Sequence, residues 1–479
     1  MQMKESKENR ASLPMLLLSG QPSKEVLHED SKDREQRFST FPSATVAFGH
    51  ESDFHGPLFS TLAALGSPRD TRAGRWTLEY VLCLSLLMAL APARALKDRF
   101  RHARRVLVAL YPGRKRPGRT YQGYLKARRK LNGRQRQALQ RHLRDQHRHL
   151  AGAYWQRDGW LAFSADGTRI EVPRTARNQK RFGCAGRKKT GPQLSLTSLY
   201  HLGTGLPWAW RIGAGTQSEQ TQLQSLARWL PRGSLLVADA GFTSFALLRA
   251  LVARGVQVLV RMGSNRTLLT GLAEVRVKVQ GEVVWLWPMR KQSTCPPLPL
   301  RLIRMEPAKH SPVYLVTSVM DEQALTDRQV GQFYRRRWGH EVFYRSFKQT
   351  LEQHKMCSRS PSEARRELEW ALLAYLVVGL WSVAALIGAQ RDPQCWSVGE
   401  SLRVVRQAMP ENRGPRRRAP LAVLLRRAVK DSYVRTGSKE ARHWPHKKND
   451  PPAGLPKIRA ATEKERRWAK RTCEQAEAA

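Results

Sequence analysis

The order of apolar segments in the middle of the chain constrains its fold more than any other feature. Five short apolar runs bounded by turn residues are typical of strands: 159–166, 193–202, 206–213, 233–242 and 256–263. Helix-type segments separate only the later runs. The first of them begins with Thr216 and Glu219 in capping-box spacing, so Glu219 is expected to cap that helix. Three strands followed by alternating helix and strand predict an α/β protein with a mixed sheet and helices on its faces.

This α/β pattern is interrupted once. Residues 262–321 contain β-type segments with no comparable helix between them, which predicts an all-β insertion. The helical pattern resumes at Thr326, a residue suited to cap a helix N-terminus, and runs to about residue 355. The expected core is therefore split into residues 153–261 and 322–390.

The chain is strongly basic. Its 479 residues include 84 Lys or Arg and 39 Asp or Glu, which gives a formal net charge of +45. Such an excess indicates a polyanionic partner, and nucleic acid is the first candidate because each neutralised phosphate releases counterions. Ribosomal, chromatin and membrane-surface proteins share this property, so charge leaves the activity open. The six cysteines lack the spacing of a zinc site or a disulfide framework, which favours a reducing cytoplasm.

Basic regions flank the predicted core on both sides. Residues 94–150 hold 19 Lys/Arg and only two acids, and their leucines recur at helical intervals. Residues 71–152 are therefore expected to form a basic helical, DNA-binding domain rather than a merely solvated one. Residues 391–479 are expected to be helical and basic too, ending in a flexible tail that lies against nucleic acid or is simply solvated. Residues 1–70 are polar and are expected to be a disordered extension.

One apolar run is long enough for a membrane span. Residues 370–388 form a stretch of 19 uncharged, mostly apolar residues, sufficient for a transmembrane helix. It would be the single convincing span, and Lys and Arg are in surplus on both sides of it, so a buried core helix is favoured over the membrane. Residues 80–93 are too short to span and also predict a buried helix. No N-terminal signal peptide is visible.

Acids at the ends of strands are informative in a chain with so many cations. Asp166 ends the first predicted strand in "SADGT", where Gly167 is expected to let the backbone turn, and Asp239 ends the fourth in "VADAGF". Carboxylates at the carboxyl ends of strands lie where open α/β sheets bind ligands, and two of them can share a divalent cation such as Mg²⁺. Taken alone, each aspartate is more commonly a turn residue.

A third acid, Glu341, lies in the arginine-rich segment "FYRRRWGHEVFYRSFKQ". On a helix, Tyr334, Arg337, Glu341 and Lys348 fall within about 60° of one another, because each residue advances by about 100°. One face therefore offers a phenol, a guanidinium, a carboxylate and an ammonium group together. The simpler interpretation is an exposed pair between Arg337 and Glu341, worth roughly a few tenths of a kcal/mol.

The spacing Tyr-x2-Arg-x3-Glu-x6-Lys resembles the Y-R-E-K signature of DDE transposases of bacterial insertion sequences, in the family named for insertion sequence four. Asp166 and Asp239 precede the signature in the order and context of that family's two aspartates. The likeness covers about residues 155–390. It implies an RNase H-like catalytic core with a β-rich insertion between the second aspartate and the glutamate.

The resemblance also implies a site and a reaction. Asp166, Asp239 and Glu341 would be the catalytic residues and the ligands of two Mg²⁺ ions, for which Mn²⁺ would substitute. The implied reaction is DNA transposition, in which insertion-sequence ends are cleaved and a strand is transferred to target DNA. Three signature residues would bind DNA phosphates near the scissile bond: Tyr334, Arg337 and Lys348.

Relatives also suggest aromatic contacts and partners. Some hold a flipped base with aromatic residues, and three tryptophans are candidates for that role here: Trp338, Trp285 and Trp287. Packing is the commoner fate of a tryptophan. The expected partners are double-stranded DNA, as transposon ends and as target, and a second copy of the chain in a synaptic homodimer, with no membrane. The expected location is the bacterial cytoplasm, on DNA.

Two alternatives use the same core. A nuclease that does not transpose would share the three acids but would need no domain for recognising ends. An inactive DNA-binding relic could have lost one or more of the acids. All three are present, which argues against this alternative.

Overall fold

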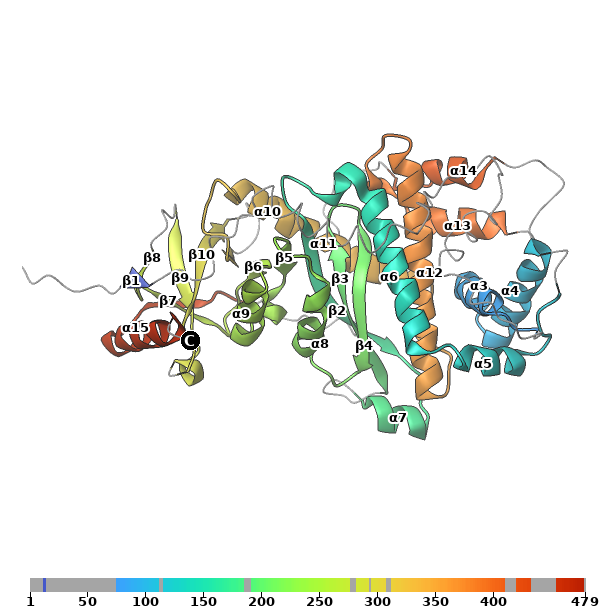
Figure 1. Cartoon of the computed structure of the whole chain (residues 1–479), viewed down its shortest axis with the longest axis horizontal. Coiled ribbons are helices and arrows are strands. Elements are labelled where there is room, and N and C mark those ends of the chain that lie inside the picture. The colour runs from blue at the N-terminus through green and yellow to red at the C-terminus, as the bar shows by residue number, and fades with distance from the viewer. Residues whose placement is uncertain are drawn as a thin grey trace, which may run out of the picture.

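The computed structural model of the chain describes residues 12–13, 75–111, 115–184, 191–275, 281–292, 294–306, 312–409, 419–431 and 454–477. Most of the expected N-terminal extension, residues 1–70, lies outside these ranges. In Figure 1 a large sheet occupies the left and centre, and a group of helices lies at the right.

Five strands form the centre of the sheet: β2 (Ala162–Glu171), β3 (Gln193–His201), β4 (Leu206–Ala214), β5 (Leu235–Ala238) and β6 (Gln257–Arg261). The first three are antiparallel neighbours, whereas β5 joins β2 and β6 joins β5 in parallel. Parallel pairing requires a crossover, which α8 (Glu219–Leu226) and α9 (Phe245–Ala253) provide. The resulting order, β4-β3-β2-β5-β6, is that of an RNase H-like core. The predicted fold class is confirmed.

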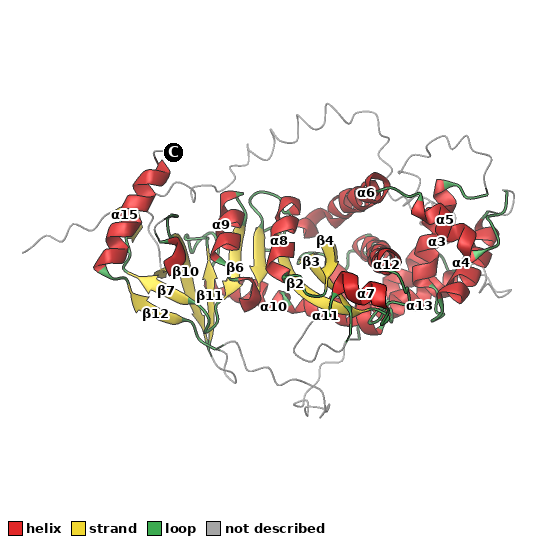
Figure 2. Ribbon diagram, turned by 90° about the horizontal axis from the view of Figure 1, so that it is seen from below, coloured by secondary structure: helices red, strands yellow, loops and turns green. Residues whose placement is uncertain are grey.

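Helices cover both faces of these strands. α8 and α9 lie on one face in Figure 2, whereas α10 (Asp327–Arg336) and α11 (Trp338–Gln349) lie on the other. The short helix α7 (Ala176–Phe182) lies between β2 and β3 in the chain.

The segment after β6 extends the same sheet instead of forming a separate layer. Its strands are β7 (Thr267–Thr270), β8 (Glu274–Val275), β9 (Glu282–Leu286), β10 (Leu298–Met305) and β11 (Val313–Thr317). β11 pairs with β6, and β10, β9 and β7 follow outward in that order. β8 pairs with β1 (Ser12–Leu13) in a two-stranded sheet of its own. The β-type insertion expected from the sequence is thus continuous with the core.

The end of the chain is folded, contrary to the flexible tail expected from its composition. β12 (Lys457–Ala460) pairs in parallel with β7 at the edge of the sheet, and α15 (Glu463–Glu477) packs beside it (Figure 2). Ala461 and Ala469 are buried in the apolar cluster that contains the insertion's Trp285. This region is ordered because it pairs with a strand and buries apolar side chains against a segment that is distant in the sequence. Its high content of charged residues gives no indication of either interaction.

The long apolar run forms the core helix α12 (Pro361–Ile387). Its length and hydropathy would suffice to cross a membrane, but 89% of its most apolar window is buried inside the fold. This burial supports the core interpretation of the sequence. Around it lie helices of both flanks: α3 (Leu78–Leu90), α4 (Leu96–Leu110), α5 (Tyr121–Arg129), α6 (Gly133–Ala151), α13 (Val398–Ala408) and α14 (Leu421–Arg427).

Candidate active site

The strand register places two of the predicted acids side by side. β2 and β5 run parallel with Ala165 paired to Ala238. Asp166 and Asp239 are the next residues on each chain segment. Equivalent positions on neighbouring strands lie roughly 4.8 Å apart and point to the same face of a sheet. The aspartates are therefore brought together by strand pairing.

Asp166 does not end its strand, as the sequence had suggested. β2 continues to Glu171 beside β3, with Asp166 opposite Ser198, and only the pairing with β5 stops at Ala165. Gly167 is therefore a strand residue and not a turn residue. A glycine is needed here for a different reason: a Cβ at this position would overlap the carboxylate of Glu219.

Glu219 has a different role from the helix cap that the sequence predicts. Ser218 is the N-cap of α8 and Glu219 is the first helical residue, so the expected capping box with Thr216 is wrong. The Glu219 carboxylate packs directly against Gly167, and from there its negative charge raises the pKa of Asp166. The available signal was the Asp-Gly pair, since a glycine beside a candidate ligand indicates the close approach of another group.

Arg261 extends the row of charged residues, and sequence reasoning missed it. β5 and β6 pair with Ala238 opposite Val260, so Arg261 follows Val260 as Asp239 follows Ala238. Its side chain acts on the Tyr334 hydroxyl, because Arg261 is one of the groups that oppose the rise in the pKa of Tyr334 caused by burial. The signal was its position, because Arg261 lies near the end of the fifth predicted strand, 256–263, much as Asp239 lies near the end of the fourth.

The Y-R-E-K residues lie on two helices instead of one. α10 starts with the predicted cap at Thr326, and α11 ends at Gln349, short of the expected residue 355. Arg337 separates the two helices, although its backbone stays in the helical region. The shared face survives this interruption. Arg337 Nη2 lies 3.1 Å from Glu341 Oε1, and the guanidinium carbon lies 5.4 Å from the ring centre of Tyr334.

Arg337 is the common partner of the three predicted acids. It is only 9% exposed, donates to Glu341, and its charge also acts on Asp166 and Asp239. Burial alone would lower the pKa of this guanidinium. Tyr334 and the three acids reverse that effect and raise its pKa. The structure thus gathers Asp166, Asp239 and Glu341 around one buried cation.

The electrostatics of the site favour an additional cation. The pKa of Asp166 is raised to about 7, chiefly by burial, and the charges of Glu341 and Glu219 add to the shift. The Gly167 N–H, which donates to Asp166 at 2.8 Å, and the charge of Arg337 oppose it. Burial lowers the pKa of Lys348, and the charge of Asp166 opposes that change. A nearby positive charge would stabilise the ionised form of Asp166.

The donor set is that of a site for hard divalent cations, which take carboxylate oxygens. In the part of the chain that the structure describes, no three Asp, Glu, His or Cys side chains are placed to hold one ion as they stand. The acids therefore line a site without forming a closed coordination shell. The chemistry of the donors and the raised pKa of Asp166 both fit a divalent cation.

The three candidate tryptophans have different surroundings. Trp285 and Trp287 are each 3% exposed in the core of the insertion, and Trp287 Nε1 donates to the Cys295 carbonyl at 2.7 Å. Their ring faces are used in packing, so neither is available to stack on a base in this structure. Trp338 is 53% exposed and follows Arg337 directly. It is the one of the three that remains a candidate.

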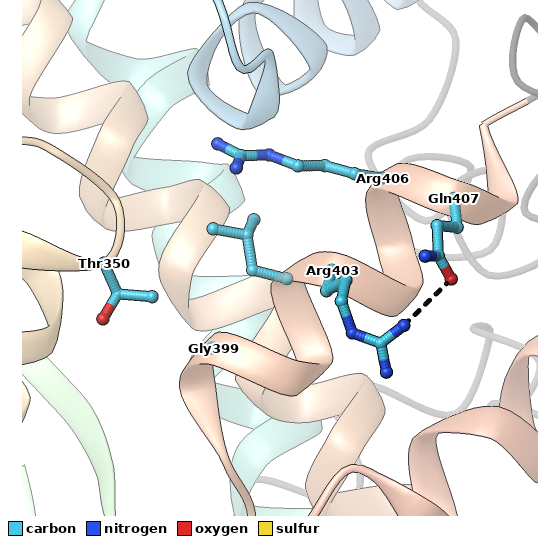
Figure 3. Close-up of a pocket in the computed structure, with 6 residues that line it drawn as sticks. Thr350, Gly399, Arg403, Arg406 and Gln407 are labelled. Carbon is cyan, nitrogen blue, oxygen red and sulfur yellow. Dashed lines mark hydrogen bonds between the residues drawn. The ribbon is translucent and has the colours of Figure 1, made fainter.

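A separate concavity of about 260 Å³ lies away from the acids, between the end of α11 and α13. Figure 3 shows Arg403 bonded to Gln407 on its wall, and Arg406 donates to the carbonyl of Leu90 at 2.8 Å. Arg403 is thus bonded within its own helix, α13, whereas Arg406 connects α13 to the end of α3. None of the predicted site residues lines this hollow.

Comparison with known proteins identifies relatives for the middle of the chain. The family model described as Transposase DDE domain matches residues 161–377. Transposase InsG for insertion sequence element IS4, from Escherichia coli (strain K12), is 27% identical over 234 residues, which cover 46% of this chain and 52% of that protein. The chain thus spans about half the length of the curated relative that it matches.

Two solved structures give weaker likenesses. The piggyBac transposase synaptic complex with hairpin DNA has a TM-score of 0.38 and 14% identity, over 82% of this chain and 89% of that one. The Mos1 transposase paired-end complex with left transposon end has a TM-score of 0.16 and 13% identity, over 50% and 68%. Scores this low establish no common fold, so the fold assignment rests on the strand order.

Proposed function

Because residues 161–377 form a transposase DDE domain of the IS4 type, we propose that the chain is a transposase that binds insertion-sequence ends and catalyses metal-dependent DNA cleavage and strand transfer. One observation carries the proposal. Asp166, Asp239 and Glu341 come from three separate elements of an RNase H-like core and share a single buried arginine, Arg337.

The three acids would hold two Mg²⁺ ions, with Mn²⁺ as a substitute. When bound, such ions lower the pKa of a water nucleophile and stabilise the leaving oxygen of an in-line displacement. Asp166 has to lose its proton before it can act as a ligand, and its pKa near 7 allows this at neutral pH. The protein's task is then to position the acids and to neutralise the charge on DNA.

The cationic and aromatic residues of the site would bind the DNA. Arg337 and Lys348 would contact phosphates near the scissile bond, and the Tyr334 hydroxyl would donate to one. Trp338 is exposed beside Arg337 and would stack on a base displaced from the duplex. The basic helices between residues 71 and 152 would bind the ends themselves, and two copies of the chain would pair two ends. The protein would work on DNA in the bacterial cytoplasm.

The test uses the full chain, Mg²⁺ and a duplex that carries the ends of its own insertion sequence, recognised as short inverted repeats bracketing the coding region. Wild-type protein should cut at the ends and join them to target DNA, and Asp239→Ala should do neither. Glu171→Gln, which alters an exposed acid on the same sheet, is the matched control. Cleavage that persists in Asp239→Ala would overturn the assignment, and cleavage without joining would indicate a nuclease.

A further inference from the structure

A chain of buried hydrogen bonds connects α11 to the sheet beneath the acids. The ring of His340 bonds through Nδ1 to Ser164 Oγ at 3.0 Å and through Nε2 to Ser198 Oγ at 2.7 Å. Ser198 Oγ also lies 2.8 Å from the Tyr344 hydroxyl, which donates to the main-chain carbonyl of Asp166 at 2.7 Å. All four side chains are buried. Three separate elements, β2, β3 and α11, are thereby joined.

The direction of every bond in this chain follows from its last member. A carbonyl only accepts, so the Tyr344 proton is committed to Asp166, and the Tyr344 oxygen must accept the proton of Ser198. The Ser198 oxygen therefore accepts from His340 Nε2–H, which leaves Nδ1 to accept from Ser164. A neutral imidazole satisfies all four bonds. Burial, and then the charge of Arg337, lowers the pKa of His340 to about 3, in agreement with a neutral ring.

The positions of these residues follow from helix and strand periodicity. Ser164 lies two residues before Asp166, so both point to one face of β2, and Ser198 is the register partner of Asp166 on β3. His340 and Tyr344 are four residues apart on α11 and face the sheet together, whereas Glu341 is the residue after His340. The network is therefore attached directly to the two segments that carry Asp166 and Glu341.

We propose that His340 and Tyr344 are positioning residues that hold the helix of Glu341 at a set distance and angle from the strand of Asp166. This inference rests on the proposed function, because it concerns the geometry of the same acids. Tyr344 contacts the main chain of Asp166 and not its carboxylate, so the network itself occupies neither carboxylate oxygen.

The site needs such a restraint because its acids repel one another. Glu341 and Asp166 carry like charges when both are ionised, and the charge of Glu341 raises the pKa of Asp166. This repulsion acts to separate α11 from β2, and Arg337 opposes it. The apolar contacts of Phe343 and Phe347 hold the helix on the core but do not set its register, since apolar attraction is non-directional. Hydrogen bonds are directional, and ligand positions matter at a scale of about 0.5 Å.

The experiment measures metal binding separately from DNA cleavage, with the full chain. Mn²⁺ is titrated into the free protein, and its binding is followed by electron paramagnetic resonance. Asp166→Asn serves as the reference in which binding at this site is lost. Tyr344→Phe removes one hydroxyl and should raise the Mn²⁺ dissociation constant roughly tenfold or more, as loss of a group that orients a ligand commonly does. Tyr375→Phe removes a buried hydroxyl outside the network and should leave the constant unchanged.

Three further variants keep the inference testable if Tyr344→Phe folds poorly. Ser198→Ala cuts the network but leaves the bond from Tyr344 to Asp166, so its effect should be smaller. His340→Leu removes both bonds of the ring, and His340→Gln, which restores one donor, should recover part of the affinity. In the cleavage assay these variants should need more Mg²⁺ for half-maximal rate, and saturating Mg²⁺ should restore most of the rate.

The outcomes separate the two proposals. If the wild type binds Mn²⁺ and cuts DNA while Tyr344→Phe and His340→Leu keep wild-type affinity, the network is merely structural and this inference is overturned. If the variants lose thermal stability in proportion to affinity and His340→Gln rescues neither, the positioning role is overturned too. If the wild type binds no Mn²⁺ at the Asp166 site, it is the proposed function that fails.

Discussion

Two groups of acids in this arginine-rich chain have opposite surroundings. On α12, the buried Glu363 pairs with three arginines, which are Arg128, Arg129 and Arg366. Burial would raise the pKa of Glu363, but the arginines, Arg128 foremost, lower it. The neighbouring Glu367 accepts hydrogen bonds from two main-chain N–H groups. The charges of these acids are therefore neutralised or solvated inside the protein, where they join the N-terminal helices to the core.

In the candidate active site the balance is reversed. Asp166, Asp239 and Glu341 share one buried arginine, and the pKa of Asp166 is raised to about 7. The chain contains enough Lys and Arg residues to give each of these acids its own cationic partner. The comparison indicates that the number of cationic partners distinguishes acids that stabilise the fold from acids that are proposed to bind a ligand. Residue type alone does not make this distinction.

The largest expected effect concerns one of the proposed catalytic acids. Glu341→Gln should lower the rate of end cleavage on the order of 10³-fold or more, as loss of a residue that acts as part of a unit does. Its melting temperature should change little, because removal of a like charge beside Asp166 offsets the loss of the pair with Arg337, which keeps Asp166 and Asp239 as counter-charges. Single-turnover cleavage and thermal unfolding measure the two effects, and a wild-type rate would remove Glu341 from the site.

The same change on α12 should have the opposite profile. Glu363→Gln leaves Arg128 buried without its counter-charge, which costs about 3–5 kcal/mol of unfolding free energy. Cleavage per folded molecule should not change. Denaturant unfolding gives the free energy, and Glu400→Gln, which breaks an exposed pair with Arg403, should be close to neutral. Equal losses in the two variants would contradict the comparison.

A smaller effect should appear in the pH dependence of stability without metal. The folded-state pKa of Asp166, about 7, lies above its ordinary value of 3.8, so between these pH values the folded chain holds a proton that the unfolded chain has lost. This group therefore makes the protein less stable as pH rises from about 4 to about 7, with no further change above. In a chelating buffer, the melting temperature of Asp166→Asn relative to that of the wild type should therefore rise by a few degrees between these pH values. Parallel profiles would refute the shift.

The smallest expected effect concerns Glu219. Glu219→Gln removes one of the two like charges that act on Asp166, so the pH at which metal-free stability levels off should move downward by less than about one unit. Gly167→Ala should act in the same direction without altering any charge, because the new methyl group displaces the Glu219 carboxylate. The same melting profiles measure both variants, with Glu171→Gln as the control that should change nothing.

Features encoded by local periodicity were predictable from the sequence. The N-cap at Thr326, the order of strand and helix in the core and the burial of 370–388 all depend on residues close together in the chain. The gathering of Tyr334, Arg337 and Glu341 was predictable for the same reason, because a helical repeat brings them to one face.

Features that depend on distant segments were not predictable in this way. Trp285 and Trp287 looked available because strand alternation does not reveal that α15 and β12 cover the insertion. Glu219 looked like a cap because its own helix offers that role, and only the packing of α8 on β2 brings it to Gly167. A terminal segment rich in charge looked unfolded because its pairing partner, β7, lies far away in the sequence.

The sequence by itself determined which residues are proposed to carry the chemistry, since the acids, their order and the signature spacing are local properties of the chain. Only the tertiary structure decided their electrostatic state. The register of β2, β5 and β6 aligned Asp166, Asp239 and Arg261, and the packing of α11 on the sheet buried Arg337 among the acids. The physical reason is that charges interact through space and burial, so the pKa of Asp166 depends on groups that the chain supplies from three separate places.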